Sequence, residues 1–245
     1  KILRSKPVNE NEKANFLVSK GADIVCADYN KEDELVNALE GTDVLISTIS
    51  LRCDIFNIQC NLLAAAKKVG VKRFIPSEFG MEHTPSTEIL LKETGRFQKE
   101  LEKSGLEYTF IYNGLFQEYL GWIGFDVKNK SVKFYVDGNT KLVSTSMADI
   151  GKYTVESLKI PEARNAHIRV AGAILTLDEY LQKFEEASGS KWEVVYDKEI
   201  PQTGAEKFKA MAMENAFFEN IDNDKFSFSP RPVTEVIGDL VSNTK

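Results

Sequence analysis

The sequence predicts an α/β protein, in which a doubly wound parallel sheet is followed by a smaller α+β lobe. The first observation is that short apolar runs alternate with amphipathic stretches, in the order β-α-β-α-β-α-β, up to residue 76. This alternation is typical of a parallel sheet whose two faces are both covered by helices. The second observation is a change of pattern near residue 120. We therefore expect one domain over residues 1–120 and a smaller, partly interleaved lobe over residues 121–245.

Each element of the first domain is indicated by its apolar spacing and by the residues that end it. Gly21, Gly41 and Gly70 each close a helical stretch, as glycine often does just past a helix C-terminus. Pro7 stops the first apolar run. The expected elements are strands at 2–3, 23–27, 43–49, 73–75 and 108–112, and helices at 10–20, 31–39, 53–69 and from about 89 to 103.

The second half of the chain predicts a lobe of mixed elements. Thr176 precedes an amphipathic stretch and Glu179 stands three positions on, which is the spacing of a capping box. The expected elements are a strand at 134–136, helices at 148–158 and 177–187, an edge strand at 192–196, a helix over 205–218 and a last short helix after residue 232.

The chain is organised around residues 71–80, an apolar strand that Pro76 halts before Ser77, Glu78 and Phe79. The strand at 43–49, the helix after it and this strand form a right-handed βαβ unit. Its two polar strand ends should therefore line one crevice, with the end of the strand at 108–112 beside them. In open α/β sheets, this edge is where ligands bind.

Composition sets limits on the partners. The 245 residues carry a formal net charge of -6, which argues against nucleic acid or an anionic membrane as the main partner. No apolar run approaches the length of about 20 residues that spans a bilayer. The first residues do not resemble a signal peptide, and we expect a cytoplasmic protein.

The cysteines and histidines give no metal-binding pattern. Cys26, Cys53 and Cys60 form no CxxC pair, and their placement favours buried thiols in a reducing compartment over a disulfide or a metal site. His83 and His167 lie far apart, without a metal-binding motif around them. We expect no metal centre.

Three segments carry a resemblance to a known family. They are Val-Lys-Arg-Phe-Ile-Pro-Ser-Glu-Phe-Gly at 71–80, Gly-Leu-Glu-Tyr-Thr-Phe-Ile at 105–111 with Asn-Gly-Leu-Phe at 113–116, and Asp-Ile-Gly at 149–151. In this order the chain resembles the NmrA-like, isoflavone-reductase-like atypical short-chain dehydrogenases, and it looks closer to the fungal members. The resemblance implies a Rossmann fold, the cofactor NADP(H) and, as in the plant members, reduction of phenylpropanoid-type double or benzylic bonds.

The N-terminus departs from the family pattern. Such proteins open with a strand and a GxxGxxG loop whose backbone amides hold the pyrophosphate. This chain starts at what the resemblance makes the second strand, so we expect the first strand and the Gly-rich loop to be absent from it. Arg4 and Lys6, at the end of that second strand, would pair with the 2′-phosphate.

The catalytic lysine is the second departure. Reductases of the family carry a lysine fourteen residues before the Tyr-Thr pair, and counting back from Tyr108 reaches Thr94. Periodicity places Thr94 on the inward stripe of the helix with Leu90, Phe97 and Leu101, and Lys92 on the far side. Lys92 is therefore either the general acid or base of a helix that begins late, or a solvated surface lysine.

The polar and aromatic residues at the strand ends carry two interpretations each. In one they surround a nicotinamide; in the other they are turn, capping or core residues. Asn113 either orients the carboxamide or tolerates a left-handed turn beside Gly114. The candidate cofactor-binding residues at the strand ends are Ser47, Thr48, Ser77, Glu78, Phe79, Asn113 and Phe116.

Two functions fit this sequence. The first is an NADP(H)-dependent reductase of a small aromatic or apolar substrate, with Lys92 as its candidate catalytic group. The second is a non-catalytic NADP(H)-binding redox sensor of the NmrA type, which binds a regulatory protein partner. Thr94 in place of a lysine favours the second.

Overall fold

The computed structural model describes residues 1–5, 12–197, 199 and 203–244, and Lys6 lies outside this range. The chain forms two compact units. The first comprises residues 1–77 and 93–108, and the second comprises residues 78–92 and 109–245. Strand β5 contributes residues to both units, so the domain boundary expected near residue 120 stays a prediction.

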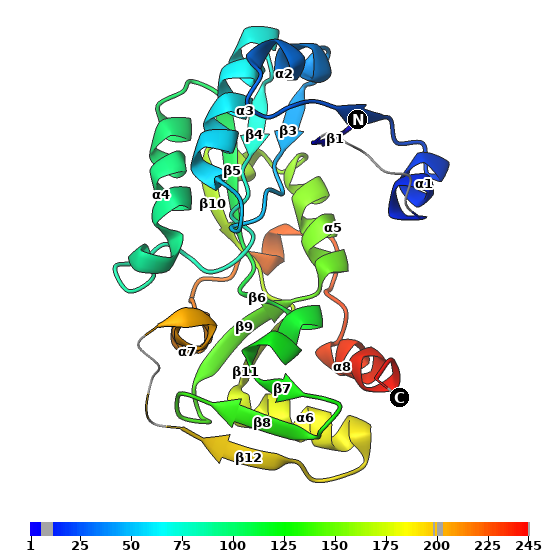
Figure 1. The fold of residues 1–245 in the computed structure, drawn as a ribbon, viewed down its shortest axis with the longest axis vertical. Helices are drawn as coiled ribbons and strands as arrows, with labels where there is room; N and C mark the ends of the chain where they lie inside the picture. The colour runs from blue at the N-terminus through cyan, green and yellow to red at the C-terminus, as the bar shows by residue number, and fades with distance from the viewer. Residues whose placement is uncertain (6–11, 198, 200–202, 245) are drawn as a thin grey trace. The chain divides into compact units, whose positions relative to one another are not determined.

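The first unit follows the expected alternation of strands and helices (Figure 1). Figure 1 shows α2 and α3 side by side. Strands β3, β4 and β5 run parallel as neighbours, with Val44 opposite Arg73 and Phe74 opposite Tyr108. The elements are β1 (Ile2–Arg4), α1 (Glu12–Ser19), β2 (Ile24–Cys26), α2 (Glu32–Leu39), β3 (Val44–Ile46), α3 (Ile55–Val69), β4 (Arg73–Ile75), the part of α4 (Glu88–Glu102) from residue 93 on, and the first two residues of β5 (Glu107–Tyr112).

A gap separates β1 from β3. Strand β1 pairs in parallel with β2, and among the described residues neither β1 nor β2 joins the β3–β4–β5 ladder. The doubly wound strand order 3-2-1-4-5-6 places the first strand between the second and the fourth. A pocket of about 460 Å³ lies there, and its lining includes Leu3, Val25, Ile46 and Thr48. No described residue supplies the strand that this order requires.

Helix α3 shows why the sequence signals at its ends were reliable. The Asp54 side chain caps its N-terminus by accepting a hydrogen bond from the Asn57 amide, at 3.4 Å. Gly70 ends it with φ +78°, a left-handed conformation that favours glycine. The expected end of the helix at Gly70 is confirmed, and β4 follows directly.

The second unit contains short strands, several of which pair in parallel (Figure 1). Strand β10 pairs in parallel with the later residues of β5, and β12 pairs in parallel with β8. The elements are β6 (Leu115–Phe116), a 3-10 helix η1 (Gln117–Ile123), β7 (Phe125–Asp126), β8 (Ser131–Phe134), β9 (Lys141–Thr145), α5 (Met147–Ser157), η2 (Pro161–Ala163), β10 (Ala166–Arg169), β11 (Ala173–Thr176), α6 (Leu177–Ser188), β12 (Glu193–Tyr196), α7 (Gly204–Asn215), η3 (Asn223–Lys225) and α8 (Val233–Ser242).

Two expectations for this unit need correction. The strand expected at 134–136 ends at Phe134, because residues 135–138 leave the ladder in a turn. The helix expected to continue to residue 218 ends at Asn215. The capping box at Thr176 and Glu179 is confirmed, with both reciprocal hydrogen bonds formed.

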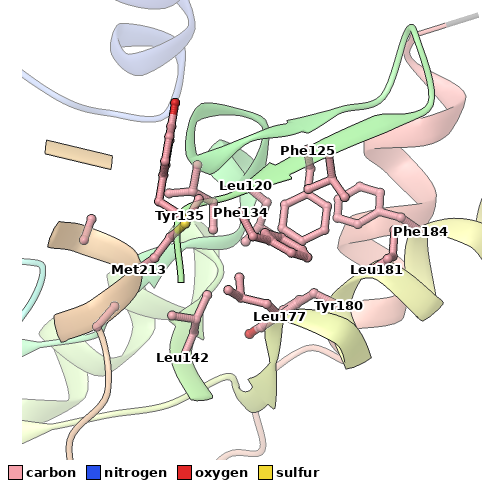
Figure 2. Packing of buried hydrophobic residues seen from close by; sticks show 14 of the residues in the cluster. Leu120, Phe125, Phe134, Tyr135, Leu142, Leu177, Tyr180, Leu181, Phe184 and Met213 are labelled. Carbon is pink, nitrogen blue, oxygen red and sulfur yellow. The ribbon is translucent and has the colours of Figure 1, made fainter. Parts of the chain in front are cut away.

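The core of the second unit is aromatic. Phe125, Phe134 and Phe184 are almost fully buried, and Figure 2 shows their rings gathered beside α6. The rings of Phe125 and Phe184 stack with their centroids 4.8 Å apart. Burying each such side chain contributes about 1.5–3 kcal/mol. This core fixes β7, β8 and α6 against one another.

The three cysteines are free thiols, in agreement with the sequence. The expectation that all are buried is wrong for Cys53, which is exposed, because α3 begins at Ile55 and leaves Cys53 in the preceding turn. Cys26 and Cys60 are partly buried.

None of the helices over the described residues is long and apolar enough to cross a membrane.

Candidate functional site

In the first unit, the ends of β3 and β4 are joined by hydrogen bonds. The Ser47 amide donates to the Ile75 carbonyl at 2.8 Å, and the Ser77 hydroxyl donates to the Ile49 carbonyl at 2.7 Å. The Ser77 amide donates to Gln59 Oε1 at 2.8 Å. Ser47 is buried, whereas Thr48 is exposed. The structure therefore brings 47–49 and 77 together at one strand edge, as the βαβ pattern predicts.

In the second unit, residues 78–80 lie beside the end of β5. Gly80 forms a parallel bridge with Tyr112, and its carbonyl accepts from the amides of Asn113 and Gly114 at 3.0 Å each. The expected adjacency of 78–80 with 113–116 is present, because Gly80 pairs with the residues that begin that segment.

Asn113 is fully buried at this junction. Its side-chain amide donates to the Gly114 carbonyl at 3.1 Å, and its own carbonyl accepts from the Thr145 hydroxyl at 2.9 Å. Asn113 Oδ1 is buried and accepts no hydrogen bond within the described structure. The positive φ of +66° belongs to Gly114, so Asn113 does not adopt the left-handed turn itself.

Glu78 is a buried carboxylate. Its side chain is 1% exposed, its Oε2 lies 2.8 Å from His83 Nε2, and the His83 side chain is 19% exposed. The other oxygen, Oε1, is buried with no hydrogen-bond partner in the described residues. The interpretation of Glu78 as a solvated turn residue is therefore wrong. A buried carboxylate needs a charged or donating partner, and His83 supplies one.

Tyr112 lies between the two histidines of the chain. Its hydroxyl is 3.0 Å from His167 Nδ1, and the two rings stack with centroids 5.9 Å apart. The His83 ring meets the Tyr112 ring edge to face, with centroids 6.3 Å apart. Sequence reasoning missed this cluster, because the histidines were considered only as metal ligands.

A second ion pair holds the loop that carries His83. Arg169 on β10 pairs with Glu82, and this hydrogen bond raises the pKa of the Arg169 guanidinium. The backbone of Arg169 is fixed in turn, because its amide donates to Asp222 Oδ2 at 2.8 Å. The loop is thus tied to β10 one residue before His83.

The aromatic candidates lie within the same unit. Phe79 and Phe116 are half-buried. The ring of Phe116 packs edge to face on Tyr119 of η1, with centroids 5.9 Å apart, and Tyr119 is 58% exposed. These rings offer apolar surface near the end of β5, where a flat ligand could stack.

Arg4 stands at the end of β1 in the first unit. It is half-buried and makes no ion pair with any other described residue. The nearby Tyr29 hydroxyl donates to the Leu3 carbonyl at 3.4 Å, and burial raises the pKa of Tyr29. Arg4 is thus a cation without an acidic partner among the described residues, which suits an anionic ligand group. Lys6, the other predicted phosphate contact, lies outside them.

Lys92 is exposed, and Thr94 is buried with Phe97 and Leu101 on the same stripe of α4. The helix is broken at Leu91, where φ is -110° and ψ is 18°. The helix thus begins at Glu88 and is interrupted at Leu91, so the late start considered for it is not observed, and Lys92 is exposed. The catalytic role of Lys92 stays a prediction, and no contact of its side chain in the described structure supports it.

No group of three or more His, Cys, Asp or Glu side chains that could hold a metal ion occurs among the described residues. The first unit carries strand-end loops, and the second unit carries one buried carboxylate paired with a histidine and aromatic rings that are half-buried or exposed. An α/β sheet with such loops at the carboxyl ends of its strands is a nucleotide-binding architecture.

A profile of the NmrA-like family matches residues 2–231, so the chain belongs to the NmrA-like family. Among named relatives, isoflavone reductase of Glycine max is 29% identical over 211 residues, covering 81% of this chain and 66% of that protein. Pinoresinol reductase 2 of Arabidopsis thaliana is 32% identical over 213 residues, covering 78% of this chain and 64% of that protein. The chain thus spans about two thirds of the length of these two relatives.

Solved structures confirm the Rossmann-like α/β fold. The structure of AtPrR2 with NADP+ and (+)pinoresinol has a TM-score of 0.79 at 24% identity, and covers 98% of this chain and 89% of that one. The complex of leucoanthocyanidin reductase with NADPH from Vitis vinifera has a TM-score of 0.81 at 23% identity, and covers 98% of this chain and 90% of that one.

Proposed function

We propose that the protein is an NADP(H)-dependent reductase of the isoflavone-reductase-like type, acting on a small aromatic or apolar substrate. The carrying observation is the loop at 77–80. It has the sequence Ser-Glu-Phe-Gly that the resemblance singles out, and it holds a buried carboxylate beside the end of β5. Relatives named isoflavone reductase and pinoresinol reductase support the substrate class.

The residues present fit parts of an NADP(H) molecule. Arg4 suits the 2′-phosphate, since it has no acidic partner among the described residues. Ser47, Thr48 and Ser77 would contact the cofactor at the strand ends of the first unit. Asn113 Oδ1 and Glu78 Oε1 are two buried oxygen atoms to which no described group donates a hydrogen bond. The NH₂ of the nicotinamide carboxamide could donate to such an oxygen.

The pyrophosphate is the part of NADP(H) for which we find the fewest candidate binding residues. The sequence contains no GxxGxxG segment, and the described residues supply no strand between β1 and β3 from which such a loop would emerge. NADPH, when bound, supplies a hydride. The protein's own part is to orient the ring, present the substrate on aromatic surface such as Phe79 and Phe116, and move a proton.

The test measures binding and turnover together. We expect NADPH to raise the melting temperature of the chain more than NADH does, and Arg4→Glu to remove that difference while leaving the response to NADH unchanged. Lys103→Glu, an exposed charge reversal in the same unit outside the strand ends, serves as the matched control for folding. Oxidation of NADPH is then followed with pinoresinol, an isoflavone and aromatic enals as substrates. A chain that neither binds NADPH nor oxidises it with any of these contradicts the proposal.

A second candidate is a non-catalytic NADP(H)-binding redox sensor with a regulatory protein partner. The observation that favours it is the α4 stripe, where Thr94 is buried and Lys92 is exposed. For the sensor we expect NADPH binding without turnover on any panel substrate. For the reductase, Lys92→Ala with unchanged turnover would remove that lysine from the mechanism.

We also place the protein in the reducing cytoplasm, which the three free thiols support.

A further inference from the structure

We propose that His83 is the proton donor of the reductase site and that Glu78 is the residue that positions it. This inference rests on the proposed reductase function and assigns an acid other than the exposed Lys92 and the buried Thr94. Lys92 faces solvent, and a threonine hydroxyl is too weak an acid to protonate a substrate near neutral pH.

The reaction class requires such an acid. When a hydride adds to the carbon end of a double bond conjugated with a carbonyl, the carbon–carbon π bond breaks and a C–H bond forms. The displaced electron pair then rests on the carbonyl oxygen. The imidazolium of His83 would give its proton to that oxygen, forming the O–H bond and keeping the N–H electron pair. Solvent would return a proton to the neutral imidazole, whose side chain is 19% exposed.

The contact with Glu78 gives His83 a defined orientation. The carboxylate is 1% exposed, and its Oε2 lies 2.8 Å from His83 Nε2. A buried carboxylate is costly unless a donor or a cation faces it, so the pair fixes which ring nitrogen of His83 faces the carboxylate. The ring is held on a second side by the edge of Tyr112, with centroids 6.3 Å apart.

The loop around His83 is anchored as a positioned catalytic group requires. Before His83 in the chain, Gly80 is bridged to Tyr112 and Glu82 pairs with Arg169. The next residue along, Thr84, donates its amide to the Thr87 hydroxyl at 2.8 Å. His83 therefore lies three residues beyond Gly80, in a short segment tied at three points. Glu78 and Tyr112 contact the His83 ring, and the Glu82–Arg169 ion pair begins one residue before it.

The experiment compares the two histidines of the chain. The Gln side chain in His83→Gln can still donate a hydrogen bond to Glu78, but it cannot transfer a proton to the substrate. The change therefore keeps a purely structural role of residue 83 and removes proton donation. With the panel substrate that the full chain reduces fastest, we expect kcat to fall about 100-fold or more, as for loss of a general acid. The KM for NADPH should stay within about 2-fold, since general-acid loss acts on the chemical step. His167→Gln is the matched control and should keep the kcat of the unmodified chain.

A second readout does not depend on turnover. With only two histidines, imidazole C–H signals in an NMR spectrum can be assigned by the same two variants. We expect NADP+ to shift the His83 signal and leave the His167 signal in place, and Glu78→Gln to shift His83 in the free protein.

The outcomes separate the role from the function. Unchanged kcat in His83→Gln, or a His83 signal that NADP+ does not move in a chain that binds it, overturns the role while the reductase function stands. NADPH binding without turnover, or no binding at all, overturns the reductase function and this role with it.

Discussion

At the scale of single residues, Gly114 is the position with the least freedom. Its φ is +66°, and a Cβ built there would lie 2.1 Å from the carbonyl oxygen of Val143 on β9. The junction of Gly80, Asn113 and β9 thus tolerates only a residue without a side chain.

We expect Gly114→Ala to destabilise the protein by about 2–5 kcal/mol, from left-handed strain and from overpacking against a backbone carbonyl. Urea denaturation followed by circular dichroism measures this loss. The matched control is Gly238→Ala in α8, where nothing lies within 4 Å of the added methyl group. That change should stabilise the protein by up to about 1 kcal/mol, through helix propensity. Equal effects at the two positions would contradict the close approach at Gly114.

The sequence predicts a site residue only where neighbouring residues in the chain determine its position. Ser47, Ser77 and Glu78 follow apolar runs that stop abruptly, so their position at strand ends could be predicted from the sequence. The pairing of Glu78 with His83 was not, because it depends on how the loop between them folds back. The contact of Tyr112 with His167 joins residues 55 positions apart, and no spacing rule covers that separation.

At the scale of elements, α5 depends on a buried acid in its first turn. Asp149 is fully buried, and its carboxylate accepts from the Ser146 hydroxyl, the Lys152 ammonium and the Arg231 amide, at 2.8, 2.9 and 2.8 Å. Burial opposes the charged form, but these donors outweigh it and lower the pKa of Asp149. The Asp149-Ile-Gly151 motif of the family thus has a structural use in this chain, since it ties the loop at Arg231 to α5.

This predicts the acid sensitivity of the fold. Because the pKa of Asp149 is lower in the folded chain than its ordinary value near 4, its contribution is complete above pH 4. It is lost as the pH falls through the folded value. Asp149→Asn should lose about 1.5–3 kcal/mol at pH 7, the worth of hydrogen bonds to a charged group. The gap to the unmodified protein should therefore narrow as the pH falls below 4.

Urea denaturation at pH 7, 4 and 2.5 checks this, with Asp239→Asn as the control. Asp239 pairs with the same arginine, Arg231, but is largely exposed, and such surface pairs contribute only about 0–1 kcal/mol. Equal stability of Asp149→Asn and the unmodified protein at pH 7 would refute the assignment.

The elements also show where periodicity was informative. The order of helices and strands up to residue 112 was predicted, mostly to within two residues, because most apolar runs are bounded by Gly, Pro or a polar cap. The exception is the strand expected at 43–49, which ends at Ile46. Strand β10 was missed, although Ala166-His-Ile-Arg169 alternates apolar and polar residues in the pattern of a half-buried strand. Strands β6 and β7 have two residues each, too few for any period to appear.

At the scale of the whole molecule, β5 belongs to both units. Glu107 and Tyr108 count with the first unit, and the residues from Thr109 on count with the second, where they pair with β10. A cut at residue 120, the boundary predicted from the sequence, would remove β10 and leave that part of β5 with an open edge.

We therefore expect a fragment of residues 1–120 to lack a cooperative unfolding transition and to bind apolar dyes, whereas the complete chain unfolds cooperatively. Differential scanning calorimetry and dye fluorescence distinguish the two. A fragment that melts in a sharp transition would show that the first 120 residues fold independently.

The gap between β1 and β3 has a consequence for what the protein can bind. Residues of both strands line a slot that no described strand fills. Any extended peptide that enters could be bound on both flanks, so the slot is a template for strand insertion. A short synthetic β-strand peptide should therefore bind this chain in the slot, and a rise in melting temperature on adding the peptide would reveal it.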